Sequence, residues 1–194
     1  MNSFGIVYRE VVDAYSRTIG QIKESLMSKF GRIVTDRYTG NFMVTGFTLN
    51  DAGRLERVEE PDICIVDPDK LRYDLVQRDA SKLLHAFTNR FNQRQVKQLS
   101  DLYFAEFGFE PVDRPDYDLG QAITDFEWNT NFAMVIMREK VLAARGQSLD
   151  SSLQEAEYHF KTGIDALDRV RVLGRLPVDD VTYIKKVMGE RFGA

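Results

Sequence analysis

The sequence predicts an α+β fold: a long N-terminal helix, an antiparallel four-stranded meander and a mostly helical C-terminal half. Three patterns predict it. Apolar residues recur four and three positions apart in the first thirty residues, short apolar runs alternate with turn residues as far as residue 67, and helical spacing returns from Asp69 onward. Periods near 3.6 indicate helices, and alternation indicates strands.

The N-terminal helix is expected over about residues 3–30, with Gly31 as its stop. One face carries an apolar stripe at heptad spacing. This stripe can pack against the chain's own sheet, or it can pair with another subunit. Because tyrosines are common in interfaces, we take its members as interface candidates: Tyr8, Val12, Tyr15, Ile19, Ile22 and Leu26.

The meander is expected to start with a hairpin that turns at Gly40-Asn41, since glycine suits the first central position of a two-residue turn. In that register Tyr38 opposes Met43 and Val34 opposes Phe47. Asp36 then lies on the better-buried face. Residues 50–53 form the next turn, and residues 54–60 and 63–67 give the third and fourth strands.

Helices are expected over about residues 69–91, 93–107, 119–144, 151–173 and 177–192, with stops at Gly108, Gly146 and Gly174. The clearest loop is residues 107–118, which contain two prolines. This loop divides the chain into residues 1–110, with the sheet, and a helical portion over 111–194. We expect the two to pack as one unit.

Composition narrows the class of protein. The chain has 194 residues, with 26 basic against 30 acidic side chains and a formal net charge of −4, which disfavours nucleic-acid binding as the main role. The single cysteine, Cys64, excludes a disulfide within the chain. It predicts a reducing compartment, such as the cytoplasm, or a place in a viral or other multiprotein particle. No apolar run is long enough to span a membrane, and the N-terminus lacks a signal-peptide pattern.

The segment Glu59–Lys70 (EEPDICIVDPDK) resembles a metal-binding or catalytic strand because aspartates flank an apolar run. Its spacing favours a simpler interpretation. Asp67 precedes a proline and suits a turn, and Asp69 suits a helix N-cap. The two histidines, His85 and His159, have no metal-binding spacing, and no glycine-rich nucleotide motif is present. We therefore predict no metal and no cofactor.

Two segments are dense in aromatic rings, residues 103–109 (YFAEFGF) and 126–132 (FEWNTNF). Aromatic side chains dominate both protein cores and binding hot spots. At helical spacing we favour the core, and the binding patch remains the alternative.

The sequence thus predicts a non-enzymatic interaction or assembly subunit of an oligomer or multiprotein complex, which binds a protein partner or a copy of itself. The alternative is a small enzyme or ligand-binding domain, with a pocket between the long helix and a curved sheet. Asp36 and Asp67 are the candidate pocket residues for that alternative.

Overall fold

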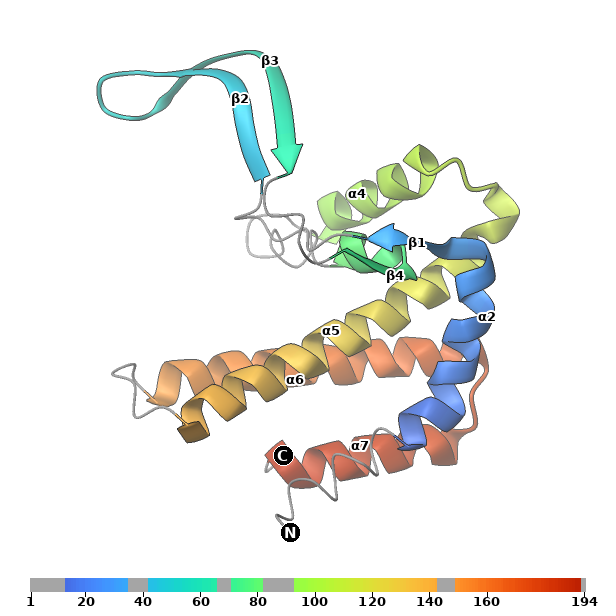
Figure 1. The fold of residues 1–194 in the computed structure, drawn as a ribbon. Coiled ribbons are helices and arrows are strands. Elements are labelled where there is room, and N and C mark those ends of the chain that lie inside the picture. Colours follow the sequence, from blue (N-terminus) through green and yellow to red (C-terminus); the bar gives the residue numbers. More distant parts are fainter. Residues whose placement is uncertain (1–12, 35–41, 66–70, 82–92, 143–148, 193–194) are drawn as a thin grey trace.

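The computed structural model describes residues 13–34, 42–65, 71–81, 93–142 and 149–192. Helices make up most of this part of the chain (Figure 1). The predicted four-stranded meander is wrong, because the described strands form two separate antiparallel sheets of two strands each. No helix in the described ranges combines the length and apolarity that a membrane span requires.

The described part of the N-terminal segment is helical, as predicted. Residues 13–15 lead into a short π-helix, η1 (Ser16–Gly20), and then into α2 (Gln21–Phe30). The helix ends at Gly31, whose N–H donates to the Met27 carbonyl. A Cβ atom at Gly31 would lie 2.3 Å from both the Met27 oxygen and the Tyr73 hydroxyl. Close approach of these groups, and not a positive φ, therefore requires glycine here.

In chain order, one pair of strands lies inside the other. β1 (Gly31–Val34) pairs with β4 (Arg72–Leu75), and between them β2 (Phe42–Leu49) pairs with β3 (Leu55–Ile65). The predicted pairing of Val34 with Phe47 is wrong. The expected third and fourth strands are one strand, β3. Alternation identifies residues that suit a strand, but it does not determine which strands pair.

The structure tests two further predictions for residues near these strands. The helix expected from Asp69 is wrong at its start, because residues 72–75 form β4 and the described helical residues begin at 77. The turn at Asn50–Gly53 is confirmed. The Asn50 side chain accepts hydrogen bonds from the N–H groups of Ala52 (3.1 Å) and Arg54 (3.0 Å), and Gly53 has a φ of 70°. The Gly40-Asn41 turn lies outside the described residues.

The C-terminal helices follow the prediction closely. They are α4 (Gln93–Glu106), α5 (Arg114–Leu142), α6 (Leu149–Gly174) and α7 (Val178–Phe192). The stop at Gly108, with a φ of 68°, is confirmed. α6 also ends at Gly174, but the left-handed residue there is Arg175, with a φ of 51°. The predicted loop over 107–118 is too long, because a 3-10 turn, η3 (Pro111–Asp113), leads directly into α5. Pro115 lies in the first turn of α5, where its missing N–H costs no hydrogen bond.

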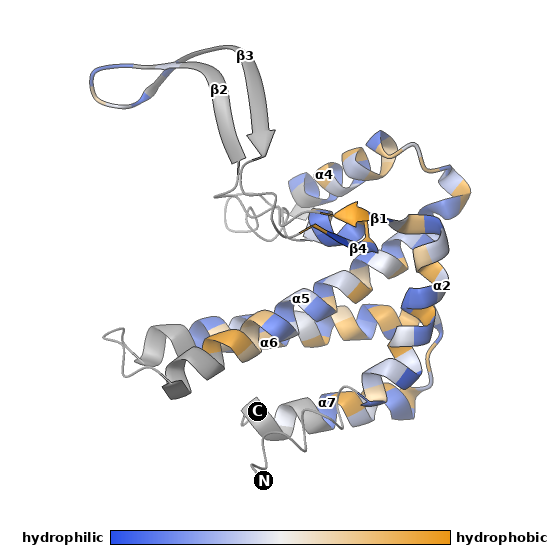
Figure 2. Ribbon diagram, viewed as in Figure 1, coloured by the Kyte–Doolittle hydropathy of each residue, from blue (hydrophilic) through white to orange (hydrophobic). Residues whose placement is uncertain are grey.

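One core joins these elements. α5 and α6 pack as an antiparallel pair, and α2 and α7 lie beside them (Figure 1). Along α5 and α6 apolar residues alternate with polar ones, as expected for amphipathic helices (Figure 2). The core takes residues from both sides of the expected boundary at 110, including Ile19, Phe30, Leu75, Tyr117, Ile123, Leu167 and Ile184, each fully buried.

Candidate functional site

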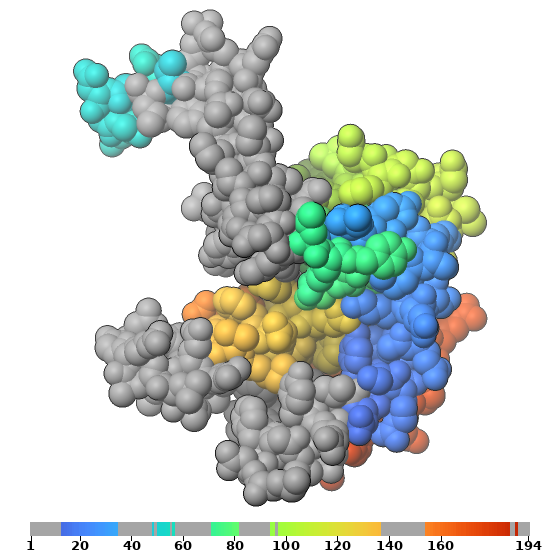
Figure 3. Space-filling model, in the orientation of Figure 1, coloured from blue at the N-terminus to red at the C-terminus, as the bar shows by residue number. Residues whose placement is uncertain are grey.

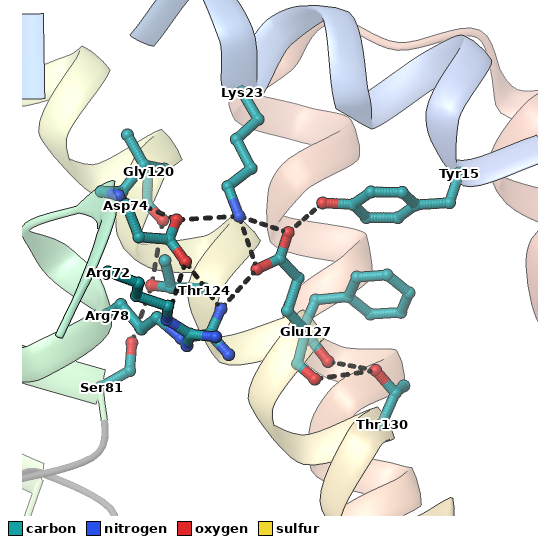
Figure 4. Close-up of polar contacts among 12 residues, drawn as sticks. Tyr15, Lys23, Arg72, Asp74, Arg78, Ser81, Gly120, Thr124, Glu127 and Thr130 are labelled. Atoms are coloured by element: carbon teal, nitrogen blue, oxygen red, sulfur yellow. Dashed lines mark hydrogen bonds and ion pairs between the residues drawn. The ribbon is translucent and has the colours of Figure 1, made fainter. Parts of the chain in front are cut away.

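Two features of the described chain stand out from this core. The first is a partly buried cluster of charged groups, which we call the base cluster: Tyr15, Lys23, Arg72, Asp74, Arg78 and Glu127. The second is the β2–β3 hairpin, residues 42–65, which we call the arm. Figure 4 shows that the cluster gathers side chains from the N-terminal helix, from β4 and the residues after it, and from α5.

Glu127 on α5 is one centre of the base cluster. Its two carboxylate oxygens accept hydrogen bonds from Lys23, each at 2.8 Å, and Oε2 also accepts from Arg78 at 3.0 Å. The Tyr15 hydroxyl donates to Oε1. Both oxygens of Glu127 are thus engaged by groups that come from two other elements.

Asp74 on β4 is the second centre. Its Oδ1 accepts the Leu75 N–H at 2.9 Å and lies 3.0 Å from the Lys23 ammonium. Its Oδ2 lies 3.1 Å from Arg78 and 3.5 Å from Arg72. Lys23 and Arg78 therefore each bridge the two carboxylates, and the bridges connect α2, β4 and α5.

The pKa values in the base cluster follow from this pairing. Burial would lower the pKa of Lys23, but the Glu127 and Asp74 carboxylates outweigh burial, and the pKa is raised. Burial, and then the Glu127 charge, raise the pKa of Tyr15. The stability that Lys23 contributes is present below the ordinary lysine pKa and is lost only as pH rises through the raised value. At neutral pH Lys23 is thus charged and Tyr15 is a neutral donor.

This arrangement of charges suits a role in positioning the elements that carry it. Three cationic side chains surround two carboxylates whose four oxygens all accept contacts. Partly buried charges that are mutually paired fix the relative placement of the elements that carry them. β4 follows the arm in the chain and pairs with β1, which precedes it. The base cluster therefore anchors β4, and through the β1–β4 ladder also β1, to the helices. Among the described residues, no group of three or more His, Cys, Asp or Glu could hold a metal ion.

The arm stands away from the helices (Figure 1). Its strands span eight and eleven residues, and no third strand among the described residues pairs with them. At the tip Thr48, residues 50–54 and Glu56 are exposed. Their atoms, cyan in Figure 3, lie clear of the helical body.

The interface candidates lie elsewhere. Ile19 and Leu26 are buried in the chain's own core, and Tyr15 and Ile22 pack against that core. Tyr15 also stacks on Phe126, with ring centroids 6.0 Å apart. These four candidates thus make intramolecular contacts. Tyr8 and Val12 lie outside the described residues.

Asp36 and Asp67, the pocket candidates, also lie outside the described residues. Cys64 occupies β3 opposite Met43. The first aromatic segment contributes to the core through Phe104, whose ring lies edge-on to Tyr117 at 5.0 Å.

The second aromatic segment is divided. Phe126 is buried, whereas Trp128 and Phe132 are half-buried and stack at 5.3 Å. His159 packs edge-on against Phe132 at 4.6 Å and hydrogen-bonds to Asn129 at 2.9 Å. This segment therefore serves both the core and a partly exposed strip of α5.

Sequence reasoning missed the charged members of the base cluster. Glu127 stands between Phe126 and Trp128, and Lys23 follows Ile22, so both charges border apolar positions. That placement is a weak signal, because a charge beside a core position is ordinary on an amphipathic helix.

The chain matches no family model, and the searches of curated proteins and of solved structures found no significant match.

Proposed function

We propose that the chain is a non-enzymatic interaction or assembly subunit and that the arm is its binding element. The observation that carries this proposal is the isolated position of the arm. It is a hairpin of eight- and eleven-residue strands that projects from a helical body and has no third strand among the described residues. A lone two-stranded hairpin is marginally stable in water. An added partner would stabilise it.

The composition of the arm supports this role. Register pairs Phe42 with Ile65 and Val44 with Ile63. Successive positions on a strand alternate between its faces, so these four apolar residues occupy positions on one face. A two-stranded hairpin needs a further strand, or a helix packed on its apolar face, for independent stability.

The base cluster also supports this proposal. A binding hairpin acts on the rest of the chain only if the segments next to it are held in place. Lys23 and Arg78 each bridge Asp74 on β4, the next described strand after the arm, to Glu127 on α5. Their charges are mutually neutralised in this structure, which favours anchoring over chemistry.

A deletion tests the proposal. Residues 42–65 are replaced by a short glycine-serine turn, and the full and armless chains are produced in the cells from which the protein comes. We expect the full chain in a complex above its own mass of 22.3 kDa. The armless chain should be a monomer, lighter than the full chain. The helical body should unfold at an unchanged temperature.

A matched control alters exposed apolar residues of the body instead. Val172→Ser with Val178→Ser changes side chains that are 63% and 60% exposed at the corner between α6 and α7. This variant should retain the complex. Equal complexes for the full and armless chains would contradict the proposal, and so would an armless chain whose helices no longer fold.

A further inference from the structure

The two long edges of the arm differ in charge. β2 contains no charged residue and no proline in eight positions. β3 contains four acidic residues and one basic residue, a net charge of −3, together with Pro61. Exposed edge strands are normally protected by charges, prolines and bulges against pairing with other chains. The β3 edge has these protections, and the β2 edge has none of them.

The irregularities of the ladder show the same asymmetry. Between the pairs Thr45–Asp62 and Phe47–Val58, β2 contains one residue and β3 contains three. Between Thr48–Arg57 and Leu49–Leu55, β2 contains none and β3 contains one. The extra residues of both irregularities thus lie in β3. Bulged strands bend and lose regular pairing, whereas β2 keeps the regular spacing that a new strand needs.

From this asymmetry we infer that the partner of the arm is a second copy of the chain, whose β2 pairs antiparallel with β2 across a two-fold axis. The inference rests on the proposed role of the arm. The product is a four-stranded sheet in the order β3–β2–β2–β3. Phe42, Val44, Ile63 and Ile65 of each copy then occupy positions on the same face of this sheet.

The distribution of charge favours the two-fold β2–β2 contact over other arrangements of the same strands. In the two-fold arrangement the two uncharged strands meet, and the two acidic strands lie at the outer edges. They are three strand spacings apart, about 14 Å, which exceeds the screening length of about 8 Å in physiological salt. Pairing of β2 with β3 of another copy would instead join a regular edge to a bulged one. It would also leave a free β2 at the end and produce an open filament.

The self-complementary edge also closes the assembly. An isologous contact uses the same surface on both copies. One β2–β2 contact therefore pairs both unprotected edges with each other and leaves neither free. The arm projects beyond the helices in Figure 1, and among the described strands β2 pairs with β3 alone.

Light scattering and sedimentation over a wide concentration range test the inference on the purified full chain. We expect a dimer of the 22.3 kDa chain. Thr45→Lys should raise the dimer dissociation constant at least tenfold, because it adds a charge to the unprotected edge. It should leave the hairpin intact, since the register places Asp62 directly opposite Thr45. Glu56→Lys adds the same side chain to the protected β3 edge, and its dissociation constant should match that of the wild type.

Single cysteines give an independent readout. In a Cys64→Ser background, Thr45→Cys, Gly46→Cys and Phe47→Cys are each oxidised with diamide. The position nearest the axis should yield a covalent dimer, because opposed residues of antiparallel strands lie about 5 Å apart. Wild-type Cys64 lies on β3, one strand away from the axis, and should give none.

A wild-type chain that stays monomeric at high concentration would overturn the inference. So would equal dissociation constants for Thr45→Lys and Glu56→Lys, or the absence of a covalent dimer at all three β2 positions. The proposed function would fail by a separate result, namely a complex in cells that survives removal of the arm. A monomeric purified chain whose cellular complex requires the arm would retain the function and assign the arm to a different protein.

Discussion

The α5–α6 pair and the arm are two long antiparallel units with opposite physical settings. Ile123, Ala133 and Val170 are buried where the helices pack together, and a Cβ atom at Gly163 would lie 3.1 Å from Thr130 Cγ2. The arm has its own ladder and no third strand among the described residues. The helices obtain their stability within the chain, whereas the arm requires an added surface to obtain comparable stability.

The base cluster joins β4, the next described strand after the arm in the chain, to the helices. Its cations bridge Asp74 on β4 to Glu127 in the middle of α5. The comparison therefore predicts large effects for changes in the body and at the cluster. Changes within the arm should leave the stability of the body untouched and alter only the hairpin and its association.

Tyr15→Glu should have the largest effect. It places a third carboxylate beside Glu127, in the position from which the tyrosine hydroxyl now donates a hydrogen bond. Partly buried like charges are costly, and we expect a loss of about 4 kcal/mol in unfolding free energy, measured by urea denaturation. Tyr15→Phe is the control. It keeps the stacking on Phe126 and should lose about 1 kcal/mol. Equal losses for both variants would show that charge is irrelevant at this position.

Glu127→Ala should rank second, at about 2–3 kcal/mol. It leaves Lys23 and Arg78 with one shared carboxylate, and the Lys23 and Glu127 side chains are only 20% and 17% exposed. Asp168→Ala removes a carboxylate that pairs with Lys185 at 2.5 Å but is 44% exposed. This surface change should cost at most about 0.5 kcal/mol. If it costs as much as Glu127→Ala, the base cluster has no special role.

Two glycines separate steric need from helix propensity. Gly31→Ala should cost about 2 kcal/mol, because the new methyl would lie 2.3 Å from the Met27 carbonyl and the Tyr73 hydroxyl. Gly20→Ala lies in helical backbone, where the nearest atoms are 3.8 Å away. It should stabilise the chain by about 0.5–1 kcal/mol. Thermal unfolding of both variants measures these changes in stability. A Gly31→Ala variant that is more stable than the wild type would refute the close packing around Gly31.

Asn50→Ala should have the smallest effect on the body. It removes the two hydrogen bonds that close the tip of the arm. The loss of about 1 kcal/mol should be confined to the hairpin. Unfolding of the helices, followed by circular dichroism at 222 nm, should therefore be unchanged. A parallel loss of helical stability would show that the arm and the body unfold as one unit.

The sequence predicted those features that depend on neighbouring residues. Gly108 and Gly174 end helices as expected, because a helix stop is a local backbone event. The turn that starts at Asn50 was predicted from its own four residues. The core face of α5, including Ile123, Phe126 and Ala133, follows from helical spacing alone.

The features that it did not predict depend on residues far apart. Lys23 and Glu127 are separated by 104 positions. The sequence around either residue does not indicate that the two are in contact. Val34 belongs equally well to a hairpin with β2 and to the observed ladder with Arg72. The alternation of polar and apolar residues is the same in both arrangements. Only the packing of Leu75 and Val76 into the core distinguishes them.

Hydrogen exchange of the intact chain at a series of concentrations tests the central claim most directly, namely that the body is self-sufficient and the arm is completed by association. Amides of α5 should exchange slowly at every concentration, because their protection arises within the chain. Amides of β2 should exchange quickly in dilute solution and become protected as concentration rises through the association range. Strong protection of β2 in the most dilute sample, equal to that of α5, would contradict the account, because the arm would then be stable without a partner.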